Sequence, residues 1–172
     1  MTLSTFPILV TDRLTLRKLL ESDVQEIFLL RSDKIVNKYL DRQPSKTLEE
    51  ALNFIRKVND KIKNDTGFYW AITLADNEKL IGTICLFDFS DELKKCKIGY
   101  ELLPNYHGQG IMNETLKKVI EFTFQTLGLN TIDASTHKDN RRSTKLLLKY
   151  NFEETKIIDE ANPNLLVYRL AK

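Results

Sequence analysis

The sequence predicts a single α/β domain of the α+β kind, in which a mixed, mostly antiparallel central sheet carries helices on both faces. Strand-like runs are interleaved with amphipathic helical runs along the chain. Residues 68–103 are typical of three consecutive strands joined by turns, which indicates an antiparallel meander. No repeat, linker or low-complexity tract divides the chain, so residues 1–172 are expected to form one domain around one core.

The first part of the chain predicts one strand and two helices. Residues 13–17, RLTLR, alternate apolar and polar side chains and indicate a half-buried strand. Ser22 is expected to cap a helix over residues 23–31. Thr47 is expected to cap a second helix, and Glu50 stands three residues later, as in a capping box.

The second part alternates strands with helices. Residues 68–74 and 80–89 form a predicted hairpin, and residues 96–103 form the next strand. A long helix is expected over residues 113–127, because its apolar side chains recur at helical spacing. A strand, a helix and two further strands are predicted at residues 131–136, 140–150, 152–158 and 165–170, with a hairpin turn at 159–164.

Composition excludes several function classes. Lys and Arg total 26 against 24 for Asp and Glu, a near balance that argues against a dedicated nucleic-acid binder. No apolar run approaches the roughly eighteen residues of a membrane span, and the N-terminus lacks the features of a secretory signal. Cys85 and Cys96 have no partner motif and are expected to be free buried thiols, as in a reducing cytosol. The sequence therefore predicts a cytoplasmic protein with neither nucleic acid nor membrane as partner. His107 and His137 lack a third ligand at useful spacing, so no metal site is expected.

Gly108 and Gly110 lie one residue apart, between a predicted strand and a predicted helix. The first amides of a helix lack partners and carry the positive end of its dipole, so a loop of small residues leading into them binds anions. We expect the amides from His107 to Met112 to converge on a diphosphate, because the glycines place no Cβ in its way. A P-loop would need Lys and a hydroxyl after Gly110, and a dinucleotide fingerprint would need glycine at Asn113, so both of these motifs are absent.

These residues resemble the GNAT superfamily of acyl-CoA-dependent N-acetyltransferases, and within it the RimJ/RimL-like branch, which acetylates N-terminal amines of ribosomal proteins. The resemblance is carried by IGYELLP with YHGQGIMNETL and by HKDNRRSTKLLLKYNF, and the opening TDRLTLR also matches the branch. The superfamily pattern, Gln or Arg, two residues, Gly, one residue, then Gly or Ala, falls on His107, Gly110 and Met112, so its first and last positions differ here.

The second block resembles the signature of the branch through Asn140, Ser143 and Phe152, with Asn151 where glycine is usual. The resemblance implies acetyl-CoA as cosubstrate. Asn140 would bond the pantetheine arm, and Ser143 would lie near the sulfur. The main chain would supply the remaining contacts. Glu101, Leu102 and Leu103 would pair with the pantetheine arm, and His107, Gly108, Gln109, Gly110, Ile111 and Met112 would hold the diphosphate.

The implied reaction is direct attack of a neutral primary amine on the thioester, with positioning supplying much of the rate. An α-amine has a pKa of about 8 and a lysine about 10.4, so a site with a weak base suits an α-amine better. We expect Glu101 to act as that base through water. Ser143 is the expected proton or hydrogen-bond donor to the leaving sulfur, because the tyrosine of many GNAT enzymes falls on Leu147 here. The basic residues Arg141, Arg142 and Lys145 are interpreted as a solvated helix face rather than as partners of the 3′-phosphate of CoA.

Three functions stay open. The first is acetylation of a protein N-terminus, with a ribosomal protein as the family precedent. The second is acetylation of a small-molecule amine such as a polyamine, antibiotic or amino acid, because the turn at 159–164 is shorter than in the branch and NLLVY replaces its His-Asp pair. The third is an acyl-CoA-binding module without turnover. A homodimer is common among resembling proteins and is left open.

Overall fold

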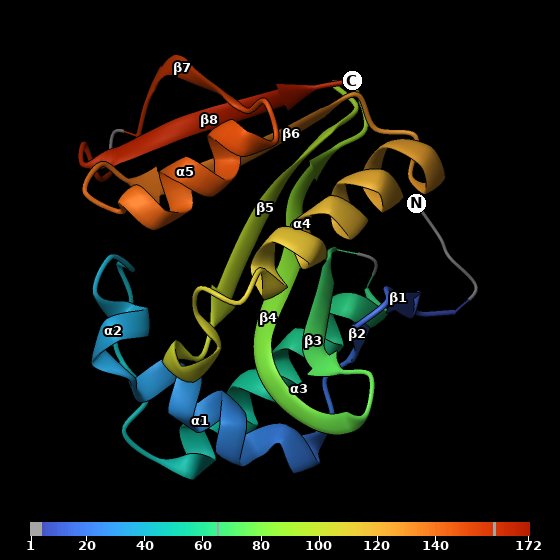
Figure 1. The fold of residues 1–172 in the computed structure, drawn as a ribbon, viewed down its shortest axis with the longest axis vertical. Coiled ribbons are helices and arrows are strands. Elements are labelled where there is room, and N and C mark those ends of the chain that lie inside the picture. Colours follow the sequence, from blue (N-terminus) through green and yellow to red (C-terminus); the bar gives the residue numbers. More distant parts are fainter. Residues whose placement is uncertain (1–4, 65, 160) are drawn as a thin grey trace.

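The computed structural model describes residues 5–64, 66–159 and 161–172. Within this part of the chain the strands are β1 Leu9–Val10, β2 Leu14–Lys18, β3 Phe68–Leu74, β4 Asn77–Ser90, β5 Lys95–Leu102, β6 Thr131–His137, β7 Glu153–Ile158 and β8 Leu165–Ala171. They form one sheet in the order β1-β2-β3-β4-β5-β6-β8-β7 (Figure 1). Every neighbouring pair is antiparallel except β5 and β6, which are parallel, so the predicted mixed and mostly antiparallel sheet is confirmed.

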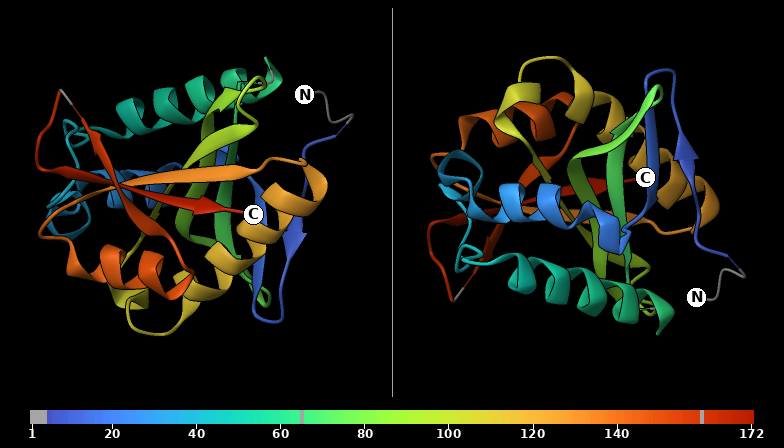
Figure 2. Two further views of the ribbon diagram at one scale, coloured as in Figure 1. Left: turned by 90° about the horizontal axis from the view of Figure 1, so that it is seen from above. Right: turned by 90° about the horizontal axis from the view of Figure 1, so that it is seen from below.

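Helices cover both faces of this sheet, as predicted (Figure 2). Their bounds are α1 Val24–Ser32, α2 Lys34–Asn37, α3 Leu48–Lys63, α4 Ile111–Glu121 and α5 Arg141–Lys149, with a π-helical turn at Phe122–Thr126 that prolongs α4 and short 3₁₀ turns at Glu21–Asp23 and Pro104–Tyr106. α1 and α3 pack on one face, against Ala71 and Leu80. α4 and α5 pack on the other face, in the hydrophobic cluster that also contains Trp70 and Ile72, with α5 over β6. Successive side chains of β3 point to opposite faces of the sheet, so this strand contributes residues to the hydrophobic layers on both sides.

The start of α3 confirms one predicted cap. The Glu50 amide donates to Thr47 Oγ1 over 3.2 Å. The Glu50 carboxylate accepts from the Lys46 amide at 2.7 Å, one residue before the partner that a capping box would use. The second helix thus begins where its sequence predicts.

The predicted cap at Ser22 is wrong. The chain enters α1 through the 3₁₀ turn, and the Asp23 carboxylate accepts the Leu20 amide at 2.8 Å. Arg17 on β2 holds the same carboxylate with two hydrogen bonds of 2.8 Å. Asp23 is 5% exposed, and its bond to a neighbouring strand outweighs the local preference of a serine hydroxyl.

Two short elements have no counterpart in the sequence analysis. β1 has two residues and α2 has four, too few for a periodicity to be seen. Asp33 caps α2 by accepting the amides of Ile35 and Val36 at 2.7 and 2.8 Å. α2 faces α5 across the open side of the molecule (Figure 1).

β5 and β6 separate halfway along their length. Their parallel pairing runs only from Lys95 opposite Thr131 to Ile98 opposite Ala134. β5 then continues to Leu102 paired with β4 alone, and β6 continues to His137 paired with β8 alone. The edge of β5 that faces β6 is consequently without a strand partner over residues 99–102.

On its other edge the same part of β5 approaches β4 closely. A Cβ atom added to Gly82 would lie 2.6 Å from the Glu101 carbonyl oxygen and 2.7 Å from Leu102 Cδ1. Real Cβ atoms do not come so near to backbone oxygen, so only glycine fits at this position of β4.

Replacing Gly82 by Ala is therefore expected to lower the free energy of unfolding by about 1–3 kcal/mol, because β5 must shift away from β4. Gly99→Ala is the matched control on β5. Its added Cβ would meet Cys85 Sγ and Phe87 at 3.4 and 3.5 Å, which are ordinary contacts. Urea unfolding of both variants measures the difference, and equal losses of stability would contradict this account of the β4–β5 contact.

Candidate functional site

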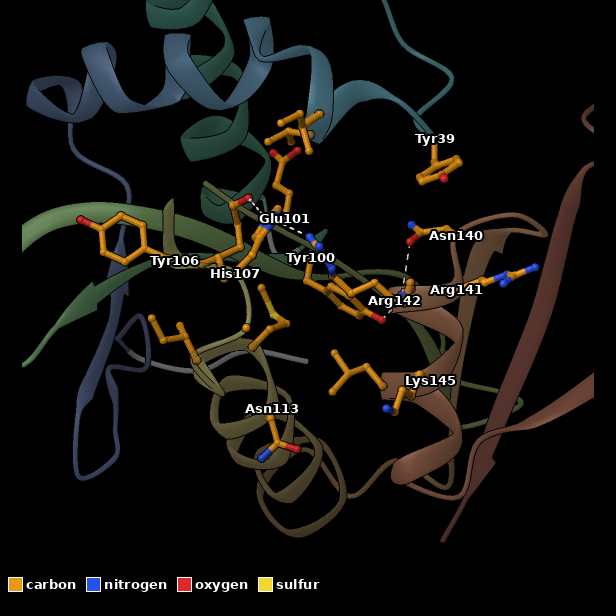
Figure 3. A pocket seen from close by; sticks show the side chains of 18 of the residues that line it. Tyr39, Tyr100, Glu101, Tyr106, His107, Asn113, Asn140, Arg141, Arg142 and Lys145 are labelled. Atoms are coloured by element: carbon orange, nitrogen blue, oxygen red, sulfur yellow. Dashed lines mark hydrogen bonds between the residues drawn. The ribbon is translucent and has the colours of Figure 1, made fainter. Parts of the chain in front are cut away.

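A cavity of 750 Å³ lies where β5 and β6 separate (Figure 3). Its walls come from four segments: the end of β5, the start of α5, α2 with the residues that follow it, and residues 107–110 with the first turn of α4. We call residues 107–110 the glycine loop. The volume of the cavity is in the range of small-molecule and cofactor sites. All the site residues predicted from the sequence line this cavity except Leu103 and Gln109.

The glycine loop presents unpaired amides to this cavity. Gly108 and Gly110 have φ values of 77° and 76°, left-handed conformations that other residues rarely adopt. Among the described residues, no hydrogen-bond acceptor is found for the amides of residues 108–112, and the first helical bond of α4 runs from the Glu114 amide to the Gly110 carbonyl at 3.0 Å. Five of the six expected amides are thus without a partner among the described residues, and those of Gly108, Gly110, Ile111 and Met112 belong to residues that line the cavity.

The expectation for the sixth amide, that of His107, is wrong. The His107 N–H donates to the Pro104 carbonyl at 3.0 Å and is not free for a phosphate. The backbone adds a second reason for the two glycines, because its left-handed conformation at both positions disfavours other residues. A Cβ on Gly110 would lie 3.5 Å from Arg13 Nη2, and one on Gly108 would have no protein atom within 4 Å. The close approach of a phosphate stays a prediction.

The expectation that the main chain of Leu103, just after β5, is free to pair with a ligand is also wrong. The Leu103 N–H donates to the Ile81 carbonyl at 2.9 Å, and its carbonyl accepts the Tyr106 amide at 3.0 Å. Backbone groups alternate in direction along a strand, so those of Glu101 point toward β4 like those of Leu103. The groups on the open edge belong to Tyr100 and Leu102. The strand geometry therefore contradicts the predicted main-chain contacts at Glu101 and Leu103, and the contact at Leu102 stays a prediction.

The Glu101 side chain is held in an ion pair. Its Oε2 accepts from Arg42 Nη2 at 2.7 Å, and Oε1 accepts from Arg42 Nη1 at 3.3 Å and from Thr83 Oγ1 at 3.4 Å. The carboxylate is 10% exposed. Arg42 also donates to Asn37 Oδ1 at 2.7 Å, so the pair fastens the segment after α2 to the sheet. The role of Glu101 as a base through water stays a prediction.

The Ser143 hydroxyl lies 2.9 Å from the Tyr100 hydroxyl, and both residues line the cavity. Burial raises the pKa of Tyr100 to about 12, although the bond to Ser143 opposes the change. Tyr100 was not named in the sequence analysis. Its sequence signal is its place on β5, two residues after the last pair with β6, which only the strand register reveals. Leu147 is fully buried in the core, so no hydroxyl stands at that position of α5.

Asn140 caps α5, and its Oδ1 accepts the Ser143 amide at 3.3 Å. The same side chain lines the cavity, which leaves its amide group available to a ligand. Arg141, Arg142 and Lys145 are exposed to solvent, as interpreted from the sequence, and they also line the cavity (Figure 3). The sequence showed the charges, but not which way the helix would turn them.

His107 joins the two walls. Its Nε2–H donates to the Leu102 carbonyl at 2.8 Å, so Nδ1 is left as the acceptor for an Arg142 N–H. The histidine side chain thereby occupies the Leu102 carbonyl on the open edge of β5 and connects the start of α5 to the glycine loop.

Across residues 5–64, 66–159 and 161–172, no group of three or more His, Cys, Asp or Glu side chains is placed to hold a metal ion. In the same residues no helix is long and apolar enough to span a bilayer. Cys96 is buried and Cys85 half-buried; both thiols are free, and burial raises the pKa of each to about 12.

Comparison with known proteins places the fold in a family. The model of the acetyltransferase (GNAT) domain family matches residues 13–153. The N-acetyltransferase YoaA of Bacillus subtilis (strain 168) is 33% identical over 153 residues, which is 89% of this chain and 86% of YoaA. The [ribosomal protein uS5]-alanine N-acetyltransferase of Escherichia coli (strain K12) is 28% identical over 101 residues, 56% of this chain and 50% of that enzyme.

Among solved structures, RimL, a ribosomal L7/L12 α-N-protein acetyltransferase in complex with coenzyme A, has a TM-score of 0.85 at 19% identity and covers 96% of this chain and 98% of its own. At that identity the likeness concerns the fold. The family match and the identity to YoaA concern the sequence itself. The chain therefore belongs to the GNAT family and is an acyltransferase of the acetyl-CoA-dependent N-acetyltransferase type.

Proposed function

We propose that this enzyme acetylates the α-amine at a protein N-terminus, as a member of the RimJ/RimL-like branch, and that the cavity between β5 and β6 holds acetyl-CoA. The observation that carries the proposal is the meeting of two sets of unpaired backbone groups in one cavity, the loop amides of residues 108–112 and the open edge of β5. A thioester cofactor with an amide-bearing arm and a diphosphate fits both sets.

In this arrangement the pantetheine arm lies along β5 and bonds the backbone N–H and C=O of Tyr100 and the N–H of Leu102. Asn140 reaches the arm from the opposite wall. The diphosphate rests on the loop amides, and the cations Arg141, Arg142 and Lys145 on α5 surround its negative charge. The basic face of α5 then stabilises an anionic cofactor at short range.

The chemistry follows from positioning. The ammonium group of the acceptor loses one proton to water, with Glu101 as the proposed acceptor beyond it, and the neutral nitrogen attacks the thioester carbon. The C–S bond breaks, the sulfur leaves as thiolate and takes a proton, and the new amide nitrogen gives up its second proton. About a tenth of α-amines are neutral at pH 7, so little base strength is needed.

The rim of the cavity supports a polypeptide acceptor. Ile35 on α2 is 60% exposed and Leu40 is 40% exposed, and both line the cavity. Apolar surface around a narrow site suits an acceptor that extends beyond it. The enzyme acting on uS5 and the structure of RimL are relatives whose acceptors are ribosomal proteins. This substrate class implies a cytoplasmic location, and a homodimer stays a proposal.

A small-molecule amine is the second candidate. The observation that favours it is the short turn between β7 and β8, whose residue 160 lies outside the described part of the chain. A long turn there would add acceptor contacts for a protein.

A test combines the purified enzyme and acetyl-CoA with a panel of amines, and follows release of free thiol and the mass of the product. We expect thiol release with peptides that have a free α-amine. The matched control is the same peptides blocked at the N-terminus and carrying a free lysine, which should react at least about tenfold more slowly, because fewer lysines are neutral. Turnover confined to polyamines, antibiotics or amino acids would replace this function by the second candidate. Coenzyme A binding without turnover on any amine would contradict both.

Ser143 and Tyr100 are expected to act in series on the leaving sulfur. The raised pKa keeps the phenol protonated, so in this proposal Tyr100 is the donor of the 2.9 Å bond and the serine O–H is left to turn toward the sulfur. Ser143→Ala should lower kcat roughly ten- to a hundredfold, because it removes one donor to developing negative charge. Tyr100→Phe should lower kcat by about three- to tenfold with little change in KM, because one hydrogen bond is lost.

The double variant decides whether the two act together. If Tyr100 works through Ser143, then Tyr100→Phe has no further effect on kcat in the Ser143→Ala background. Independent, multiplying effects of the two substitutions on kcat would show that Tyr100 contributes by another route. A rise in KM alone in the Tyr100→Phe variant would show that Tyr100 only binds substrate.

A further inference from the structure

Arg13, at the start of β2, lies against the back of the glycine loop. Its Nε donates to Glu114 Oε2 at 2.7 Å, its backbone N–H donates to Glu114 Oε1 at 3.2 Å, and its Nη1 donates to the Gln109 carbonyl at 3.2 Å. Thr11 adds a hydroxyl bond to Glu114 Oε1. Segments about a hundred residues apart in sequence are thereby fastened to the loop that carries the open amides.

The bond to Gln109 sets the direction of one peptide group. All described peptide bonds are trans, so the Gln109 carbonyl and the Gly110 N–H point in opposite directions from the same plane. The carbonyl points at Arg13. The Gly110 amide therefore points away from Arg13, and Gly110 lines the cavity, which Arg13 and Gln109 do not. Because glycine flanks this segment on both sides, its peptide groups rotate at low cost and need an outside contact to stay in place.

The charge of Glu114 makes the same contact necessary. A carboxylate in the first turn of α4 is favourable toward the helix dipole, but it also repels an anion held by the neighbouring amides. Burial raises the pKa of Glu114, and the hydrogen bonds from Thr11 and Arg13 outweigh it, so the pKa is lowered overall and the group is ionised at neutral pH. Arg13 cancels this charge beside the anion site.

We propose that Arg13 is a positioning residue for the cofactor, which turns the Gln109–Gly110 peptide so that the Gly110 amide faces the diphosphate, with Glu114 holding the guanidinium in place. The inference rests on the proposed acetyl-CoA site and deepens it. It assigns the recognition of the diphosphate in part to a side chain that does not line the cavity.

The test separates the diphosphate from the rest of the cofactor. Arg13→Ala, Arg13→Lys and Glu114→Gln are compared with the wild type by calorimetry with coenzyme A and by kcat/KM with acetyl-CoA and with S-acetylpantetheine, which has the thioester arm but no diphosphate. We expect Arg13→Ala to weaken coenzyme A binding by about ten- to thirtyfold, the loss of a charge-assisted hydrogen bond. Reaction with S-acetylpantetheine should be unchanged. Arg13→Lys and Glu114→Gln should fall between, because each keeps part of the contact.

Arg56→Ala is the matched control. Arg56 makes a similar exposed ion pair, with its Nε 2.8 Å from Glu21 Oε1, on the opposite face of the sheet from the loop. Coenzyme A binding should be unaffected by its loss. Thermal unfolding of every variant is recorded, and if Arg13→Ala does not fold, the lysine and glutamine variants decide the result.

Three results would overturn the proposal. Arg13 variants that bind coenzyme A like the wild type would show that the loop holds its shape alone. Equal losses with acetyl-CoA and S-acetylpantetheine would reduce Arg13 to a residue of general stability. A wild-type protein that does not bind coenzyme A would remove the proposed function itself, a failure distinct from the other two because it appears before any substitution is made.

Discussion

The site depends on the end of parallel pairing between β5 and β6 at Ile98 and Ala134. Backbone N–H and C=O groups inside a protein need partners, and a strand that loses its neighbour halfway must find others. Gly82 on β4 lets β5 approach closely on one edge, while the other edge of β5 is without a strand partner over residues 99–102. The glycine loop follows directly, and its amides are as unpaired as those of the strand edge. One break in the ladder thus creates both surfaces to which a ligand would bind.

The charged side chains around the cavity mainly hold this backbone in place. Glu101 and Arg42 fasten the segment after α2 to the sheet, and His107 with Arg142 joins the loop to α5. Such half-buried pairs contribute little net stability, because the cost of desolvating the two groups offsets their attraction. They fix the geometry all the same, since moving one partner away would leave the other unsatisfied. The Glu101 carboxylate is held by Arg42 and is therefore not a free base in the cavity. A site that binds through main chain and reacts through positioning tolerates this, provided that its acceptor amine is already partly neutral.

Much of the fold could be predicted, because the periodicity of apolar residues indicates the strands and long helices, and Gly108 and Gly110 indicate the loop. The errors share a physical cause, which is contact between segments distant in sequence. Ser22 lost its capping role to Asp23, because Arg17 on another strand binds that carboxylate. Leu103 was assigned free groups, yet strand alternation turns them toward Ile81 on β4. Tyr100 was missed because its exposure to the cavity depends on where β6 leaves β5. The basic face of α5 is exposed as interpreted, but sequence spacing does not say that it also borders the cavity.

The account is tested most directly by following the backbone amides of Gly108, Gly110 and Ile111 in ¹⁵N-labelled protein by NMR as coenzyme A is added. If these groups hold the diphosphate, their resonances shift strongly with coenzyme A and remain nearly unmoved with pantetheine, which should instead affect Tyr100 and Leu102. Saturated binding of coenzyme A with the three loop amides unperturbed would contradict the central claim that unpaired main chain, created by the parting of two strands, forms the cofactor site.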